Sequence, residues 1–210
     1  WKGYAAMNAL SGTIEQYWTR RASSYTEVVK KNLADGWDGK WADELIRNFP
    51  KAEGRALRIL DIGTGPGFYA IILAARGYEV TAVDLPDPVK AYGEWRRVLR
   101  DGGVMLNIDS NWYAYLFDDE KRLEKQADRE NTIQAGFDDH ESYDEGWLME
   151  NISRSLPMGR LPRPQWDAVT LLDLGFKNVS ADTSVSKRLW SREEMSNYAS
   201  TPCFLIRAVK

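Results

Sequence analysis

The sequence RILDIGTGPGFYAIILAARGYEVTAVDL, residues 58–85, decides the fold of this chain. Its apolar start ends in glycines, which is typical of a buried parallel strand. After three alternating glycines, residues 68–76 have the apolar spacing of a helix that stops at Gly77. A second strand is predicted directly after this helix. The stretch is therefore a strand–turn–helix–strand unit with a carboxylate at the tip of each strand, Asp61 and Asp84.

The glycine-rich turn suits a ligand that contains a nucleoside. Glycines permit a sharp bend and a close approach of the ligand to the main chain. The first N–H groups of the following helix point into the turn, and Asp84 can accept hydrogen bonds from two ribose hydroxyls. The dinucleotide pattern G-x-G-x-x-G fails, because Phe68 stands where the third glycine is required. Asp61, two residues before the first glycine, would repel a pyrophosphate but would attract a ligand with an ammonium and a sulfonium.

The pattern D-x-G-x-G-x-G followed by Asp84 resembles the class I S-adenosylmethionine (SAM) methyltransferases, specifically the small-molecule, methyltransferase type 11-like group. The segment WRRVLRDGGVML, residues 95–106, resembles that family's helix, Gly-Gly turn and following strand. The resemblance implies SAM as cofactor, S-adenosylhomocysteine as product and a small-molecule methyl acceptor. It also implies that the turn holds the methionine part of SAM and that Asp84 holds the ribose. The cofactor-binding residues predicted in this way are Asp61, Gly63, Thr64, Gly65, Pro66, Gly67, Asp84 and Leu85.

The resemblance also implies the fold class, which is α/β with a Rossmann-like, doubly wound sheet. The sheet is expected to be mostly parallel with a C-terminal antiparallel hairpin, and to carry N-terminal helices and a helical lid. We predict one SAM-binding domain over residues 1–210, in which 1–54 form the helical cap, 55–112 and 164–210 the core, and 113–163 the lid.

An N-terminal helix is predicted over residues 11–35. Thr13, with Gln16 three residues later, has the pattern of a capping box at the helix start, and Gly36 provides the stop. The segment YWTRRASSY within it resembles the leader helix that covers the cofactor in many small-molecule methyltransferases. The resemblance implies cofactor contacts for three residues, although packing on the domain alone would explain them equally well. These residues are Tyr17, Arg21 and Tyr25.

A third strand is predicted over residues 104–109, and polar and aromatic residues follow it. Ligands of open α/β sheets lie beyond the carboxyl ends of the strands. Asn111, Trp112 and Tyr113 are therefore predicted to face the substrate, with a plain turn and aromatic packing as the alternative. No strong catalytic base stands out. The weak candidates, needed only where the acceptor must be deprotonated, are Asp109, Tyr113 and His140.

Residues 117–150 carry twelve acids and four bases, a net charge of −8, whereas the rest of the chain carries +5. This bias favours a cationic or metal-binding substrate, although a solvated helical face explains it without any ligand. A helix is predicted after Pro164, with Trp166, Val169, Leu172 and Leu174 packed on the sheet. Residues 176–185 and 203–209 are expected to close the sheet as a hairpin, joined by a short helix that Ser191 caps.

The chain passes directly from Leu85 to Pro86, where the resembled family has a helix, two strands and their loops. About fifty residues are missing by this comparison, since a βα pair occupies roughly 25–30 residues. The missing part includes the strand that normally lies beside the first one. We favour the interpretation that a segment is absent from the sequence at this point; a truly reduced sheet is the alternative. If a segment is omitted, the Cα atoms of Leu85 and Pro86 should be much further apart than the 3.8 Å of a normal peptide.

Composition excludes several classes of protein. The net charge of −3 provides no basic field for nucleic acid, and one histidine cannot form a His-rich metal site, so no metal is predicted. A single cysteine fits a reducing, cytoplasmic location, and no apolar run is long enough to span a membrane. A homodimer is possible.

Three other functions stay open. The chain could be a non-catalytic SAM-binding or interaction protein, because a clear base and the middle elements are absent. An NAD(P)-dependent oxidoreductase is disfavoured by the glycine spacing. A methyltransferase acting on RNA or protein is the third alternative, and the acidic balance argues against RNA.

Overall fold

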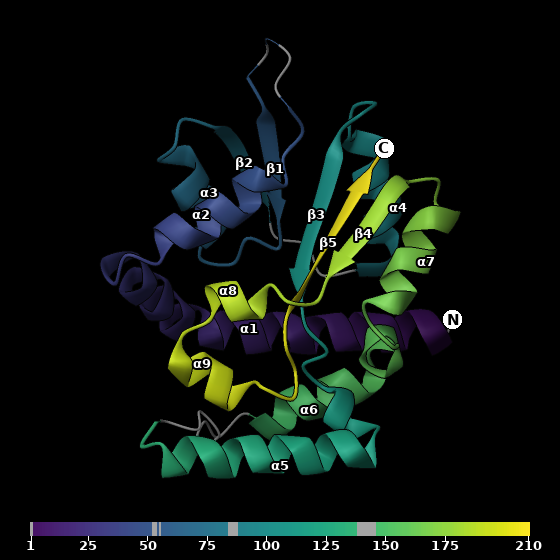
Figure 1. The fold of residues 1–210 in the computed structure, drawn as a ribbon. Helices are drawn as coiled ribbons and strands as arrows, with labels where there is room; N and C mark the ends of the chain where they lie inside the picture. The colour runs from purple at the N-terminus through teal and green to yellow at the C-terminus, as the bar shows by residue number, and fades with distance from the viewer. Residues whose placement is uncertain (1, 52–53, 55, 84–87, 138–145) are drawn as a thin grey trace. The chain divides into compact units, whose positions relative to one another are not determined.

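The computed structural model describes residues 2–51, 54, 56–83, 88–137 and 146–210 (Figure 1). They belong to two compact units, residues 1–94 and 95–210. Each unit mixes helices and strands, so the predicted α/β class is confirmed.

The first unit contains one long helix and a small strand–helix–strand motif. Its elements are α1 (Lys2–Ala34), α2 (Asp38–Arg47), β1 (Arg58–Ile62), α3 (Phe68–Ala74) and β2 (Glu79–Val83); α4 (Pro88–Val98) continues into the second unit. β1 and β2 are parallel and pair from Arg58 opposite Glu79 to Ile62 opposite Val83. The strand–turn–helix–strand prediction is confirmed.

Helix α1 begins earlier than predicted. Thr13 lies inside the helix, so the predicted start with a capping box is wrong. The reason is that the residues before it include alanine, methionine and leucine, which are strong helix formers and continue the helix back to Lys2. The predicted stop is correct. Gly36 has φ +74° and donates to Leu33 O, while Trp37 N donates to Asn32 O, which is a Schellman motif.

The strand β1 is less buried than its apolar sequence predicts. Leu60 is 44% exposed, and Ile71 on α3 is 45% exposed. Parallel strands are normally covered on both faces, and a two-stranded pair has too few neighbours to provide that cover. The exposed apolar surface is what the absence of an adjoining strand would produce.

The second unit is built on a three-stranded sheet. Its elements are β3 (Val104–Asp109), η1 (Ala114–Leu116), α5 (Asp119–Gln134), α6 (Gly146–Ser155), η2 (Pro157–Arg160), α7 (Gln165–Asp173), β4 (Lys177–Asp182), α8 (Ser186–Leu189), α9 (Arg192–Asn197) and β5 (Phe204–Val209). β5 lies between β3 and β4 and is antiparallel to both (Figure 1). Leu205, Ile206 and Ala208 of β5 are buried and form the centre of this unit's core.

The C-terminal antiparallel pairing is thus confirmed, whereas the single, mostly parallel sheet is not what the described strands form. They form a parallel pair and a separate antiparallel sheet. The physical reason lies in the sequence, because β2 ends at Val83 and α4 begins at Pro88, and the four positions between them are too few for another βα pair. The predicted gap in the chain falls on residues 84–87, which lie outside the described residues.

Helix α7 turns a different face inward from the one predicted. Asp167 and Leu171 are fully buried, whereas Val169 and Leu172 are 57% and 55% exposed. The prediction failed because it counted only apolar residues. Asp167 lies on the buried face because it forms an ion pair there. A search for hydrophobic periodicity does not find this face, because the residue four positions before Leu171 is charged.

Candidate functional site

The glycine turn between β1 and α3 has the conformation that its sequence predicts. Gly63, Gly65 and Gly67 have φ values of +76°, +48° and +85°, a region that side chains disfavour. The turn is held to the second strand, because Gly63 N and Thr64 N donate to Val83 O at 2.8 and 3.3 Å. A Cβ atom built on Gly63 or Gly65 would have no protein atom within 4 Å. The glycines are therefore required by the backbone, and the space beside them is open.

Asp61 directs its carboxylate into this turn. The Thr64 hydroxyl donates to Asp61 Oδ2 at 2.8 Å, and Gly67 N donates to Thr64 O at 2.9 Å. Pro66 lies within the tight bend that these bonds enclose. The residues predicted to hold the methionine part of the cofactor, Asp61 to Gly67, are thus assembled into one structured turn at the N-terminus of α3. A fixed carboxylate beside open space is suited to an ammonium group.

The three α1 residues predicted to cover the cofactor lie together on that helix. The Arg21 guanidinium is 6.0 Å from the Tyr17 ring centroid and 5.6 Å from that of Tyr25. Trp18 contacts both tyrosines edge to face, at 5.1 and 5.4 Å. Their mutual contacts show a packed aromatic stripe around Arg21. A role in cofactor binding stays a prediction.

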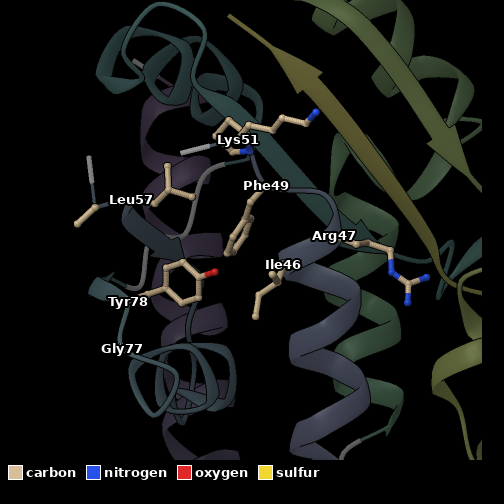
Figure 2. A pocket seen from close by; sticks show the side chains of 9 residues that line it. Ile46, Arg47, Phe49, Lys51, Leu57, Gly77 and Tyr78 are labelled. Carbon is tan, nitrogen blue, oxygen red and sulfur yellow. The ribbon is translucent and has the colours of Figure 1, made fainter. Parts of the chain in front are cut away.

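The first unit also has a hollow of about 450 Å³ at the opposite end of its strands. Leu57 and Tyr78, which line it, come just before β1 and β2, whereas the glycine turn follows β1. Phe49 packs edge to face on Tyr78 with ring centroids 5.4 Å apart. In Figure 2, the charged ends of Arg47 and Lys51 point away from this ring pair. The hollow is therefore separate from the glycine turn, and the charged ends of the two basic residues that line it do not converge on its ring pair.

In the second unit, an ion-pair network lies at the carboxyl end of β3. The Arg163 side chain, 7% exposed, donates from Nε and NH2 to Asp167 at 2.8–3.1 Å and from NH1 to Asp109. These carboxylates raise the pKa of Arg163 despite the opposing effect of burial. Asp109, a candidate base, is thus held in an ion pair by Arg163.

The two predicted substrate residues beside Trp112 are also fixed by this unit. Asn111 Nδ2 donates to Arg163 O at 3.1 Å. The Tyr113 ring lies 6.3 Å from that of Tyr115, whose hydroxyl donates to Glu150 on α6 at 2.7 Å. These contacts connect the end of β3 to α6 and to the start of α7.

Trp112 belongs to an aromatic cluster, which we define as Trp112, Trp190 and Tyr198. Its ring centroid lies 6.5 Å from that of Trp190 and 5.5 Å from that of Tyr198, and the latter two rings are 5.9 Å apart. Trp112 is 41% exposed. The cluster lies at the edge where β3 and β4 end and β5 begins, since Asp109 pairs with Phe204 and Asp182 with Leu205.

Sequence reasoning missed four residues of this second region. Arg163 and Asp167 have the i, i+4 spacing of a helical ion pair, so their pairing could have been proposed from sequence. Trp190 and Tyr198 carried no local signal, because their proximity to Trp112 arises only from the sheet pairing.

Several predicted residues are not tested. Asp84, Leu85 and His140 lie outside the described residues. Within the described ranges, no group of three or more acidic, histidine or cysteine side chains is arranged to hold a metal. No helix in the described part of the chain combines the length and apolar character needed to cross a membrane.

Comparison with known proteins agrees with the family that the sequence of the glycine turn indicates. A family model described as "Methyltransferase domain" matches residues 33–175, which include α2, the whole turn and β3. This match supports the resemblance to class I SAM-dependent methyltransferases. A search of curated proteins finds no match.

Proposed function

Because the chain belongs to the family of methyltransferase domains, we propose that it transfers a methyl group from SAM to a small-molecule acceptor. The observation that carries this proposal is the turn between β1 and α3. It combines three glycines at positive φ, a carboxylate fixed by Thr64 and open space where side chains would otherwise stand.

The residues of the turn fit the chemical groups of SAM. Asp61 would bind the ammonium of the methionine part, and the N–H groups that start α3 would bind its carboxylate. A Cβ at Gly65 would enter the open space, so any larger residue would compete with the ligand there. The ribose contact is assigned to Asp84 by family resemblance.

SAM supplies an activated methyl group on a sulfonium, so an acceptor lone pair can displace it in line. The protein then needs to orient the acceptor and exclude water more than it needs a dedicated base. An ion pair at Asp109 is consistent with a mechanism without a dedicated base, because this candidate base is bound to Arg163. Asn111, Trp112 and Tyr113 are proposed to form part of the acceptor wall.

The test is binding of S-adenosylhomocysteine by calorimetry. We expect Gly65→Val to abolish binding and Asp61→Asn to weaken it about tenfold, through the loss of one charge-assisted contact. Gly102→Val is the matched control, because Gly102 also has a positive φ, +73°, and open space around its Cβ position. It should carry similar backbone strain and bind normally.

The outcomes separate the competing functions. If the wild-type protein does not bind S-adenosylhomocysteine, the proposal is refuted. Binding of NADH instead would favour an NAD(P)-dependent oxidoreductase. Tight binding without turnover over a broad acceptor panel would favour a non-catalytic SAM-binding protein. The cytoplasmic location and the homodimer stay predictions.

A further inference from the structure

Within the first unit, helix α2 packs against α3, the helix that begins at the glycine turn (Figure 1). Ala42 and Leu45 of α2 are buried, and so are Ile72 and Leu73 of α3. α2 therefore belongs to the structure that supports the turn, although it contributes no residue to the glycine motif.

Trp41 of α2 contacts both residues with which α3 begins. Gly67 is the N-cap of α3, so Phe68 and Tyr69 are its first two residues. The Trp41 ring lies 6.3 Å from that of Phe68, edge to face at 89°, and 5.6 Å from that of Tyr69. The rings of Phe68 and Tyr69 are 5.6 Å apart. The three partly buried rings thus contact one another in a triangle at the start of α3.

Hydrogen bonds connect the start of α3 to the glycine turn. Ile71 N donates to Gly67 O at 2.9 Å, which is the first bond of the helix. Gly67 N donates to Thr64 O at 2.9 Å, and the Thr64 hydroxyl donates to the Asp61 carboxylate at 2.8 Å. A shift of the first residues of α3 would therefore also move the turn and its carboxylate.

A second contact joins α2 to the other end of α3. Asp38 forms an ion pair of 3.5 Å with Arg76, whose NH1 also donates to Ile72 O at 3.0 Å. The two charged side chains are 40% and 27% exposed, and an ion pair open to solvent contributes little to stability. This pair lies at the C-terminal end of α3, away from the turn. Trp41, in contrast, contacts the end from which the turn is held.

We propose that Trp41 is a positioning residue for the cofactor. By packing on Phe68 and Tyr69, it fixes the start of α3 and thereby the turn that would hold the methionine part of SAM. The inference rests on the proposed methyltransferase function and adds to it a residue from outside the glycine motif. It requires no contact between Trp41 and the ligand.

Hydrogen exchange of the ligand-free full chain tests the positioning directly. Trp41→Leu should speed exchange of the Gly67 and Ile71 amides about tenfold, because two aromatic contacts that hold the start of α3 are lost. The amides paired between β1 and β2 should exchange as in the wild type. Phe49→Leu is the matched control, since Phe49 also forms an aromatic contact in this unit, with Tyr78, but at the opposite end of the strands. It should leave the turn unchanged.

The proposal is overturned if Trp41→Leu leaves exchange at the turn unchanged, or if it speeds exchange equally throughout the unit. If Trp41→Leu fails to fold, Trp41→Phe decides. Its smaller ring keeps part of the contact, so exchange should rise about threefold and only at the start of α3; no selective rise would overturn the assignment.

Two ligands test the consequence for binding by calorimetry. S-Adenosylhomocysteine and 5′-methylthioadenosine share the nucleoside, but only the former carries the amino-acid part that the turn would hold. Trp41→Leu should weaken S-adenosylhomocysteine binding about tenfold and change 5′-methylthioadenosine binding by less than about twofold. Phe49→Leu should alter neither. Equal weakening of both ligands would show a general structural role and overturn the proposal.

The same samples separate this inference from the proposed function. If the wild type binds S-adenosylhomocysteine and Trp41→Leu binds it equally well, the cofactor stands and the role of Trp41 is refuted. If the wild type does not bind it, the proposed function is refuted, and the exchange experiment still decides whether Trp41 holds the turn.

Discussion

Replacing Arg163 by methionine should destabilise the second unit strongly. The change removes the donor of three hydrogen bonds to Asp167, whose side chain is fully buried, and the partner of Asp109. Breaking a buried ion pair on one side leaves an uncompensated charge and typically costs about 3–5 kcal/mol. Asp109 is 33% exposed, so water can solvate it after the change. We therefore assign most of the loss to Asp167.

Urea unfolding followed by circular dichroism measures this loss. With a denaturant slope of about 2 kcal/mol/M, the midpoint should fall by about 1.5–2.5 M. Asp109→Asn, which removes the charge of the more exposed partner, should cost only about 1 kcal/mol. If Arg163→Met does not fold at all, Arg163→Lys keeps the charge without the planar fork and gives a measurable intermediate loss.

The double variant Arg163→Met, Asp167→Leu separates the buried charge from lost packing. It removes both charges and should be more stable than Arg163→Met alone, since apolar residues can replace a buried ion pair at little cost. The reasoning is refuted if Arg163→Met lies within 1 kcal/mol of the wild type. It is also refuted if the double variant is less stable than the single one.

Three further predictions concern the same unit. Ser191→Ala removes half of the capping box of α9 and should cost about 1 kcal/mol in urea unfolding; no change would show that α5 alone holds the helix. Burial raises the pKa of Cys203 to about 11, so at pH 8 only about one thiol in a thousand is a thiolate, and iodoacetamide should label it far more slowly than the urea-unfolded chain. Hydrogen bonds from Ser184 and Arg188 lower the pKa of Asp182 to about 2. Its stabilising effect is then present above pH 4 and lost between about pH 4 and 2, so Asp182→Asn should be destabilising at pH 7 and nearly neutral at pH 2; a pH-independent difference would contradict this.

Local sequence was sufficient for the strand–turn–helix–strand unit that runs from β1 to β2. The turn Gly63–Gly67 needs positive φ values that glycine alone adopts readily, and both strands and the helix are short-range patterns. The capping box at Ser191 and the stops at Gly36 and Gly77 were predicted for the same reason, since each depends on residues within a few positions. Local signals failed at the start of α1, because the residues before the apparent capping box continue the helix back to Lys2.

Tertiary structure decided everything that depends on pairing between distant segments. The sequence placed Trp112 and Asp109 at the end of a strand, but the aromatic cluster arises because β5 pairs antiparallel with both β3 and β4. The inward face of α7 likewise includes an ion pair, because the buried Asp167 is paired with Arg163. Burial of a charge depends on its partner, and hydropathy along one helix contains no information about that partner. The sequence by itself thus determined the glycine turn, whereas the arrangement at the carboxyl end of β3 was determined by the sheet and by the charges that it brings together.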